Sequence, residues 1–266
     1  MKVDTYFKKL NLSNLLIPNF QNLCTLQLAQ LTHIPFENLD CLNDLTPSID
    51  LSFLMKKLIH HNRGGYCFEL NILFMNALVV LGFKVRPLLA RSMWRGSAIN
   101  SKTHIVLLVE ISHKLYLADA GFGGPGLYHP IPLEMNKEFQ QILGTFRVVE
   151  SDEHGHILQK KNRDLGEWMN IYAFNLEYVY ESDLMMANFY TSKYPESFFR
   201  HNLVISLHTS TGRKTLMNKK FNSIDGDNVI EIEIETISDL KKIIKNEFHL
   251  EVSEQINFNN ILAFKV

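Results

Sequence analysis

The sequence predicts an α+β fold in which helices come first, short antiparallel strands fill the middle, and strands followed by a helix end the chain. Three observations indicate this order. Apolar residues recur at helical spacing through the first eighty residues, alternate with polar residues after Gly82, and return to helical spacing near the end. With 266 residues, the chain is long enough to bury most of its apolar surface, either in one large domain or in several lobes.

The composition argues against several classes of protein. A balance of 27 basic against 28 acidic residues leaves no electrostatic footprint for nucleic acid or an anionic membrane. The longest apolar runs, such as residues 77–81, are far shorter than the ~20 residues that span a bilayer. Charged side chains occupy the first ten residues in place of an apolar signal core. We therefore expect a cytoplasmic protein that binds neither nucleic acid nor a membrane.

The three cysteines, Cys24, Cys41 and Cys67, indicate a reducing compartment. An odd number at unrelated spacings favours neither a disulfide framework nor a zinc cluster, so no metal is expected. We interpret Cys24 and Cys41 as core or incidental residues.

Helical spacing in the first eighty residues is clear in residues 23–31 and 51–58. Between them, residues 33–40 mix apolar and polar side chains around a proline, which predicts an irregular segment. Glu37 and Asn38 are expected to satisfy local backbone groups in this buried connection.

Cys67 stands at the start of a further helix. Apolar residues form a stripe along residues 70–81, and Cys67 lies three residues before this stripe on the same face. The thiol is therefore expected to point inward in the first turn, where backbone N–H groups and the helix dipole favour a thiolate. A cysteine on an apolar face is usually a small core residue, but Arg63, Gly64 and Gly65 just before it are poor core material.

After this helix the pattern becomes that of strands. Residues 84–91 predict a strand, and Pro87 within it indicates an edge or a bulge. Residues 91–102 are polar and small, which predicts a loop. Residues 103–110 and 114–120 then predict an antiparallel hairpin with a short polar turn.

This hairpin brings His104 near Asp119. With a four-residue loop at residues 110–113, the two side chains stand directly opposite each other, with Cβ atoms about 4.5–5.5 Å apart. A two-residue loop makes them diagonal neighbours on the same face, and a three-residue loop separates them. A lone strand histidine is more often a satisfied core or surface residue, but an aspartate on an apolar face needs a partner, and His104 is the natural candidate.

Residues 120–126 are rich in glycine and indicate a flexible turn or a loop whose backbone approaches a ligand, not a dinucleotide fingerprint.

The rest of the chain is expected to contain further strands and two helices. The strands in the middle predict a β-barrel or a tightly curled antiparallel sheet. The expected elements are strands at residues 144–150, 155–161 and 168–174, a helix at 181–190, strands at 203–209, 213–217 and 228–235, and a helix at 237–248. We expect boundaries between lobes near residues 85 and 190.

A thiol, a histidine and an acid in this chain order match the nucleophile, base and orienting group of covalent catalysis. His104 would hold the Cys67 thiolate as an ion pair, and Asp119 would fix the imidazole tautomer. The expected chemistry is acyl transfer through a thioester, with water, an amine or another thiol as the acceptor.

Five segments, in this order and spacing, look like the motifs of one enzyme family. They are residues 35–39 (PFENL), 63–67 (RGGYC), 103–104 (TH), 119–123 (DAGFG) and the region 191–213. By this combination the chain resembles the arylamine N-acetyltransferase family along most of its length.

The resemblance implies three domains with a Cys-His-Asp arrangement like that of cysteine proteases. They are an N-terminal helical bundle carrying the nucleophile (1–85), a central antiparallel β-barrel carrying the histidine and the acid (86–190), and a C-terminal α/β lid (191–266). The implied reaction is a ping-pong acetyl transfer, as in xenobiotic metabolism. Acetyl-coenzyme A acetylates the cysteine, and an arylamine, a hydrazine or an N-hydroxyarylamine then accepts the acetyl group.

The same resemblance assigns the triad. Cys67 is the acylated nucleophile, His104 its partner and Asp119 the third member. Arg63 and Glu37 are implied to form a buried pair that holds the cysteine loop.

The resemblance also implies the contacts of the two substrates. Phe36 and Phe122 are expected in the acceptor pocket, and Thr103, Gly123 and Gly124 near the entry of the coenzyme pantetheine arm.

The family's acceptor pocket also draws on the loop at residues 92–102, where Met93, Trp94 and Arg95 stand, so this loop is expected to govern acceptor choice.

An amide synthase that closes a specialised metabolite from a carrier-bound acyl chain uses the same catalytic residues. A papain-like or transglutaminase-like hydrolase shares the Cys, His, Asp order, and a non-catalytic binding module is the remaining alternative. The residues leave open the physiological acceptor, the acyl chain length, the coenzyme phosphate contacts and the oligomeric state.

Overall fold

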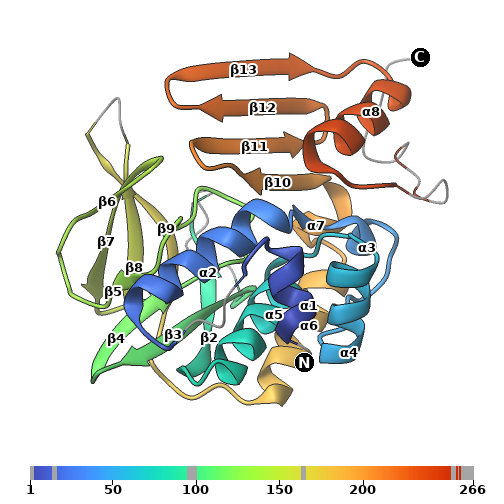
Figure 1. Cartoon of the computed structure of the whole chain (residues 1–266). Helices are drawn as coiled ribbons and strands as arrows, with labels where there is room; N and C mark the ends of the chain where they lie inside the picture. Colours follow the sequence, from blue (N-terminus) through green and yellow to red (C-terminus); the bar gives the residue numbers. More distant parts are fainter. Residues whose placement is uncertain are drawn as a thin grey trace.

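The computed structural model describes residues 3–13, 17–94, 101–162, 166–252, 256 and 258. Helices come first, followed by an eight-stranded antiparallel sheet that curls into a nearly closed barrel, and by a five-stranded antiparallel sheet with a helix against it (Figure 1). This arrangement confirms the predicted α+β class. Arg95 and the rest of residues 95–100, which belong to the loop expected to govern acceptor choice, lie outside the described residues.

The first part of the chain forms helices around the segment that carries Cys67. They are α1 (Val3–Lys9), α2 (Phe20–His33), α3 (Leu39–Leu42), α4 (Leu51–Leu54), the π-helical segment η1 (Met55–His60) and α5 (Cys67–Val80). Helix α5 begins at Cys67, as predicted. Its first eight residues are all buried, so it passes through the interior instead of exposing one polar face.

The segment at residues 33–40 contains a short strand, which the sequence pattern did not predict. Strand β1 (Phe36–Glu37) pairs with a strand near the C-terminus, and Phe36 also forms a parallel bridge with Gly65. Glu37 satisfies a local backbone group as expected, because it accepts from the N–H of Leu39. Asn38 instead bonds backbone groups more than 160 residues away, among them the N–H of Val204.

The middle of the chain forms the barrel. Its strands are β2 (Lys84–Ser92), β3 (His104–Ile111), β4 (Lys114–Ala118), β5 (Ile131–Pro132), β6 (Phe139–Gln141), β7 (Gly144–Ser151), β8 (Gly155–Lys161) and β9 (Trp168–Phe174), in the spatial order β5-β4-β3-β2-β9-β8-β7-β6. Pro87 lies in the part of β2 that pairs with β3, whereas pairing of β2 with β9 begins at Ala90. Pro87 therefore occupies an edge position within an inner strand.

The hairpin of β3 and β4 has a two-residue turn. Ile111 pairs with Lys114, and the turn residues Ser112 and His113 have φ angles of 49° and 64°. The four-residue loop that would place His104 directly opposite Asp119 is therefore wrong, and the diagonal arrangement is present. Ser-His is not one of the residue pairs that usually signal a turn with two positive φ angles.

The last part of the chain forms the second sheet and the helices beside it. Its elements are α6 (Glu181–Lys193), α7 (Phe198–His201), β10 (Val204–His208), β11 (Gly212–Met217), β12 (Lys220–Asp225), β13 (Asn228–Glu233) and α8 (Ile237–Phe248). The sheet has the order β1-β10-β11-β12-β13, so a strand from the first part of the chain joins it at the β10 edge. The division near residues 85 and 190 remains a prediction.

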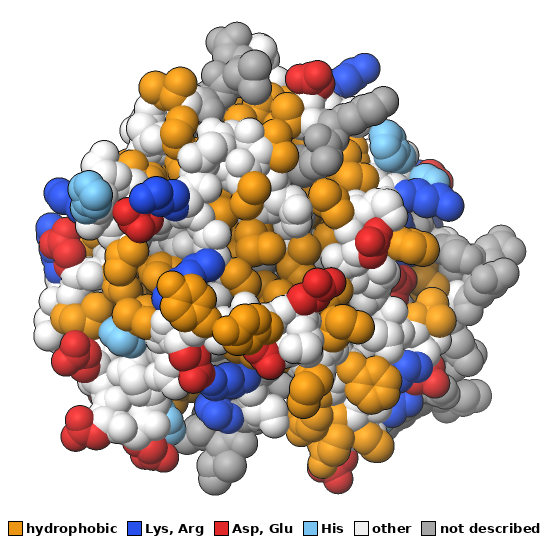
Figure 2. All heavy atoms as spheres, turned by 90° about the horizontal axis from the view of Figure 1, so that it is seen from below, with side chains coloured by type: hydrophobic (Ala, Val, Ile, Leu, Met, Phe, Trp, Pro, Cys, Tyr) orange, Lys and Arg blue, Asp and Glu red, His pale blue; other side chains and the backbone are white. Residues whose placement is uncertain are grey.

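Side chains of both charge signs are interspersed with hydrophobic side chains on the face shown in Figure 2. This face has no extended patch of a single sign, in keeping with a formal net charge of −1. In the described part of the chain, no helix is both long enough and apolar enough to cross a membrane.

Candidate active site

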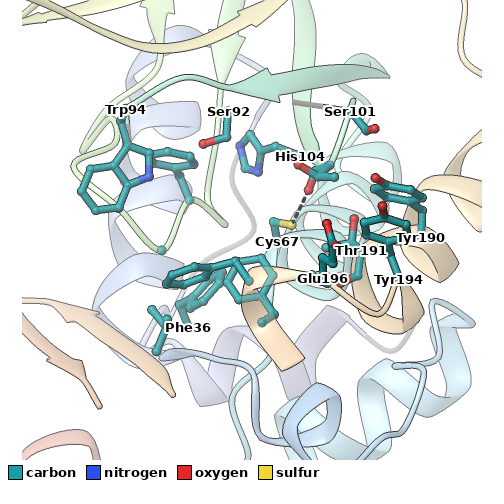
Figure 3. A pocket seen from close by; sticks show the side chains of 18 residues that line it. Phe36, Cys67, Ser92, Trp94, Ser101, His104, Tyr190, Thr191, Tyr194 and Glu196 are labelled. Atoms are coloured by element: carbon teal, nitrogen blue, oxygen red, sulfur yellow. Dashed lines mark hydrogen bonds between the residues drawn. The ribbon is translucent and has the colours of Figure 1, made fainter. Parts of the chain in front are cut away.

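A cavity of about 510 Å³ lies where the helices, the barrel and the second sheet meet (Figure 3). Seven of the eight site residues named from the sequence line it. These are Phe36, Cys67, Thr103, His104, Phe122, Gly123 and Gly124. The eighth, Asp119, lies behind His104 and is bonded to it. The structure therefore brings together all the residues assigned from the sequence.

Cys67 presents its thiol to this cavity from the first turn of α5. The side chain is 3% exposed, and Sγ donates a hydrogen bond to the carbonyl of Thr103 at 3.6 Å. Burial raises the pKa of the Cys67 thiol well above its ordinary value, and the charge of Asp119 acts in the same direction, whereas a hydrogen bond from the N–H of Phe68 lowers it. A thiolate at Cys67 therefore needs a cation beside it.

His104 can supply that cation. It is the only basic side chain among the described residues that line the cavity. Figure 3 shows its imidazole and the Cys67 thiol facing the same space. His104 Nε2 donates to Oδ2 of Asp119 at 2.8 Å, and both side chains are buried. The carboxylate accepts the ring N–H and so fixes the tautomer and the orientation of the imidazole.

Two polar residues that the sequence reasoning missed hold Asp119. Asn71 Nδ2 donates to Asp119 Oδ1 at 2.9 Å, and Asn71 Oδ1 accepts from the N–H of Ala120. Gln27 Oε1 accepts from the N–H of Asp119 at 2.9 Å. Both side chains are fully buried. A polar residue four positions after Cys67 on the same helix was a signal for Asn71.

Aromatic rings enclose the His104 imidazole. The ring centroid of Phe122 lies 4.9 Å from that of His104, and the ring centroid of Tyr172 lies 5.3 Å from it. Tyr172, on β9, is fully buried and was not predicted as a site residue. By excluding water, these rings strengthen the hydrogen bond between His104 and Asp119.

Behind the cysteine loop lies a group of paired charges, here called the paired cluster. It consists of Glu37, Asp40, Lys57, Arg63 and Glu69. Arg63 Nη2 bonds Glu37 Oε1 at 2.7 Å and Asp40 Oδ1 at 3.0 Å, and Lys57 Nζ bonds Glu69 Oε1 at 2.8 Å and Asp40 Oδ2 at 2.7 Å. Arg63 and Glu37 are thus in direct contact, the arrangement implied by the family resemblance.

The paired cluster fixes the backbone around the nucleophile. Glu69 Oε2 accepts from the N–H of Tyr66 at 3.1 Å, which satisfies a backbone donor at the start of α5. The loop packs so closely that a Cβ atom on Gly64 would lie 2.4 Å from the carbonyl oxygen of Pro35. Close backbone approach therefore requires glycine at this position.

Helices α6 and α7 supply a wall of the cavity that was not predicted from the sequence. The lining residues from this region are Tyr190, Thr191, Tyr194, Glu196, Ser197, Phe198 and Phe199. Trp94, in the loop expected to govern acceptor choice, also lines the cavity, so the described part of that loop does shape it. The wall is rich in aromatic rings and suits a planar apolar ligand.

Known proteins resemble this chain over nearly its full length. A family model described as N-acetyltransferase matches residues 19–257. The arylamine N-acetyltransferase / N-hydroxyarylamine O-acetyltransferase of Salmonella typhimurium is 36% identical over 255 residues, which make up 95% of this chain and 90% of that protein. The arylamine N-acetyltransferase of Escherichia coli is 34% identical over the same shares.

Solved structures show the same similarity. The Salmonella typhimurium arylamine N-acetyltransferase has a TM-score of 0.89 and 33% identity, covering 98% of this chain and 97% of that one. The Mycobacterium marinum arylamine N-acetyltransferase in complex with CoA has a TM-score of 0.90 and 28% identity, with the same coverage of both chains.

Proposed function

Because the chain belongs to the arylamine N-acetyltransferase family, we propose that it transfers an acetyl group from acetyl-coenzyme A to an arylamine or a hydrazine, with N-hydroxyarylamines as further acceptors. The observation that carries this proposal is the buried pair of His104 and Asp119 in the same cavity as the thiol of Cys67. A nucleophile, a base and an orienting acid in one apolar cavity match covalent acyl transfer.

The cavity wall fits a thioester donor with a narrow, uncharged arm. Thr103, Gly123 and Gly124 contribute backbone and a hydroxyl to it, and the described lining contains no lysine or arginine. The rings of Phe36 and Phe122 pack against the glycines, since a Cβ atom on Gly123 would lie 2.6 Å from the ring of Phe36. Such a wall offers hydrogen bonds to amide groups along the pantetheine arm, and apolar surface to an aromatic acceptor.

The first half of the reaction acetylates Cys67. The thiol gives its proton to His104, and the thiolate attacks the thioester carbonyl carbon, forming a new carbon–sulfur bond. The bond from that carbon to the coenzyme sulfur breaks, and the coenzyme leaves as a thiol with the proton from His104. Asp119 stabilises the imidazolium while it exists. Burial supports this role of His104, because it disfavours an isolated thiolate at Cys67.

The second half releases the acetyl group. The acceptor nitrogen attacks the carbonyl carbon of acetyl-Cys67, and His104 takes the proton that the nitrogen loses. A carbon–nitrogen bond forms, the bond to Sγ breaks, and Cys67 regains its proton from His104. The aromatic rings that line the cavity support an aromatic acceptor.

The test is the intact mass of the protein after incubation with acetyl-coenzyme A in the absence of an acceptor. We expect one added acetyl group on Cys67, its loss on adding an arylamine, and acetylation slowed by about a thousandfold or more in Asp119→Asn. Cys24→Ser, which changes a half-buried cysteine outside the cavity, is expected to acetylate normally. A protein that gains no acetyl mass, or gains it outside Cys67, would contradict the proposal.

A further inference from the structure

The second sheet has one apolar face and one polar face. Helix α8 packs against the apolar face, where Ile205 of β10 and Leu216 of β11 pair across the strands (Figure 1). Side chains alternate along a strand, so Ser206 and His208 lie on the opposite face. Arg213 joins them there because it pairs directly with His208.

These three residues, here called the unpaired cluster, contain buried polar atoms without partners. Ser206 is 2% exposed and His208 is 4% exposed. Ser206 Oγ, His208 Nε2 and Arg213 Nε are buried and make no hydrogen bond within the described part of the chain. Native proteins rarely leave such atoms unsatisfied, so a cluster of three on one face requires an explanation.

The unpaired cluster also carries an uncompensated charge. Arg213 Nη1 donates to the carbonyl of Gly124, and no carboxylate of the described residues forms an ion pair with this guanidinium. Burial, with the charges of Arg213 and Lys160, lowers the pKa of His208 to about 3, so this histidine is neutral. Arginine keeps its proton in proteins. Arg213 is partly buried, and a cation that is partly removed from water without a counter-charge favours an anion beside it.

The unpaired cluster adjoins the catalytic cavity. Gly124, which accepts the hydrogen bond from Arg213, lines the cavity. Val204 lies on β10 two residues before Ser206, hence on the same face, and lines the cavity as well. Ser206, His208 and Arg213 do not line the cavity themselves, and the ring of Tyr128 packs on His208 with centroids 4.6 Å apart. Arg213, bonded to Gly124, is the member of the cluster that directly contacts the cavity wall.

We propose that Ser206, His208 and Arg213 form an anion subsite that binds a negatively charged group of a substrate of the acetyl transfer. This inference rests on the proposed function. Two sources carry suitable chemistry, namely the phosphate esters of coenzyme A and a carboxylate on the acceptor. Arg213 supplies the charge, and Ser206 and His208 supply further hydrogen bonds.

The first experiment compares substrates that differ only in their anionic groups. KM values are measured for acetyl-coenzyme A and for S-acetylpantetheine, which has no phosphate, with an uncharged arylamine as the acceptor. They are also measured for a carboxylated arylamine and for its uncharged amide. We expect Arg213→Met to raise KM about tenfold for one anionic substrate, and by less than about twofold for the matching uncharged one. A change confined to the donor pair identifies a phosphate, and one confined to the acceptor pair identifies a carboxylate.

Two variants of similar chemistry serve as controls. Arg213→Lys keeps the positive charge and is expected to recover most of the affinity. Lys214→Met removes a positive charge from the next position of β11, where the side chain faces Glu247 of α8 at 2.9 Å, and is expected to leave all four KM values unchanged. Equal changes of KM for charged and uncharged substrates in Arg213→Met, or no change at all, would overturn the anion subsite.

A binding measurement separates this inference from the proposed function. The increase in melting temperature caused by free coenzyme A is compared with that caused by pantetheine, and the increase caused by the carboxylated arylamine with that caused by its amide. We expect the larger shift of one anionic ligand to disappear in Arg213→Met and to persist in Lys214→Met. These melting-temperature measurements do not depend on turnover. Absence of acetyl transfer would refute the proposed function alone, and equal shifts in wild type for both pairs would refute the subsite alone.

Discussion

Two groups of charged and polar side chains lie beside the cavity, and they differ in whether their cations contact carboxylates. In the paired cluster, Lys57 and Arg63 contact carboxylates at 2.7–3.0 Å. In the unpaired cluster, Arg213 bonds a carbonyl and no described carboxylate. Both groups lie against loops that carry site residues, so their location does not explain the difference.

We infer that the paired cluster stabilises the backbone, whereas the unpaired cluster binds a ligand. In the paired cluster, Glu37 and Glu69 each accept a backbone N–H in addition to a cation, so the ion pairs set the path of the chain around Cys67. In the unpaired cluster, Arg213 retains an unsatisfied Nε beside neutral His208. The ion pairs of the paired cluster favour one conformation of the backbone around Cys67. Arg213, without a carboxylate partner, can instead form charge-assisted hydrogen bonds with an anionic ligand.

The largest expected effect is the loss of a partner within the paired cluster. Arg63→Met removes the two hydrogen bonds that Nε and Nη2 donate to Oε1 of the fully buried Glu37 and leaves Lys57, 3.9 Å away, as the cation beside this carboxylate. We therefore expect the free energy of unfolding to fall by about 3 kcal/mol, measured by urea denaturation. Lys84→Met breaks an exposed pair with Glu110 and is expected to cost less than about 1 kcal/mol. An equal decrease in the free energy of unfolding for the two variants would show that the pair of Arg63 and Glu37 does not stabilise the fold more than an exposed pair does.

A smaller effect should appear in the pH dependence of stability, through Glu69. Burial raises the pKa of Glu69 to about 7, and the carboxylates of Glu37 and Asp40 act in the same direction, while Lys57 opposes them. Between about pH 4.5 and 7, the folded protein holds a proton on Glu69 that the unfolded chain has lost. This contribution to the free energy of unfolding therefore falls as pH rises through that window, and is level above it.

Glu69→Gln cannot titrate, so it should remove this fall. We expect the difference in unfolding free energy between wild type and variant to change by about 2 kcal/mol between about pH 5 and pH 7.5, measured by urea denaturation. Glu134→Gln, at an exposed pair with Lys137, should follow the wild-type curve at both pH values. Parallel curves for wild type and Glu69→Gln would mean that Glu69 does not titrate in this window.

The sequence predicted those parts of the fold and site whose residues are close along the chain. The helix start at Cys67 follows from apolar spacing, and the proximity of His104 and Asp119 follows from one hairpin. The pairing register of this hairpin depends on the length of its turn. Ser112 and His113 adopt positive φ angles, but Ser-His is not a residue pair that predicts such a turn from the sequence. The actual pairing differs from the predicted one by two residues, which keeps both side chains on one face, so His104 and Asp119 still meet despite the wrong loop length.

Interactions between distant segments could not be predicted in this way. Strand β1 forms because β10, more than 160 residues later, offers its edge. Strand β12 has little apolar alternation and forms because β11 and β13 flank it. Gln27 reaches the N–H of Asp119 across 92 residues. The unpaired cluster arises in the same way, because a local pattern does not reveal which carboxylates the folded chain brings near Arg213.

The smallest expected effect is on the stability of the unliganded protein when the unpaired cluster loses its charge. Arg213→Met removes one hydrogen bond to Gly124 together with a partly buried cation that lacks a described counter-charge. Loss of the hydrogen bond destabilises the fold, whereas replacing an uncompensated charge with an apolar side chain of similar length is often neutral or stabilising, so the two effects oppose each other. We expect the free energy of unfolding, measured with urea and without ligand, to change by less than about 1 kcal/mol in either direction. Arg63→Met is the matched control, since the chemical change is identical and only the partners differ. A cost for Arg213→Met as large as that for Arg63→Met would show that Arg213 holds the fold as Arg63 does, and the distinction between the two clusters would be lost.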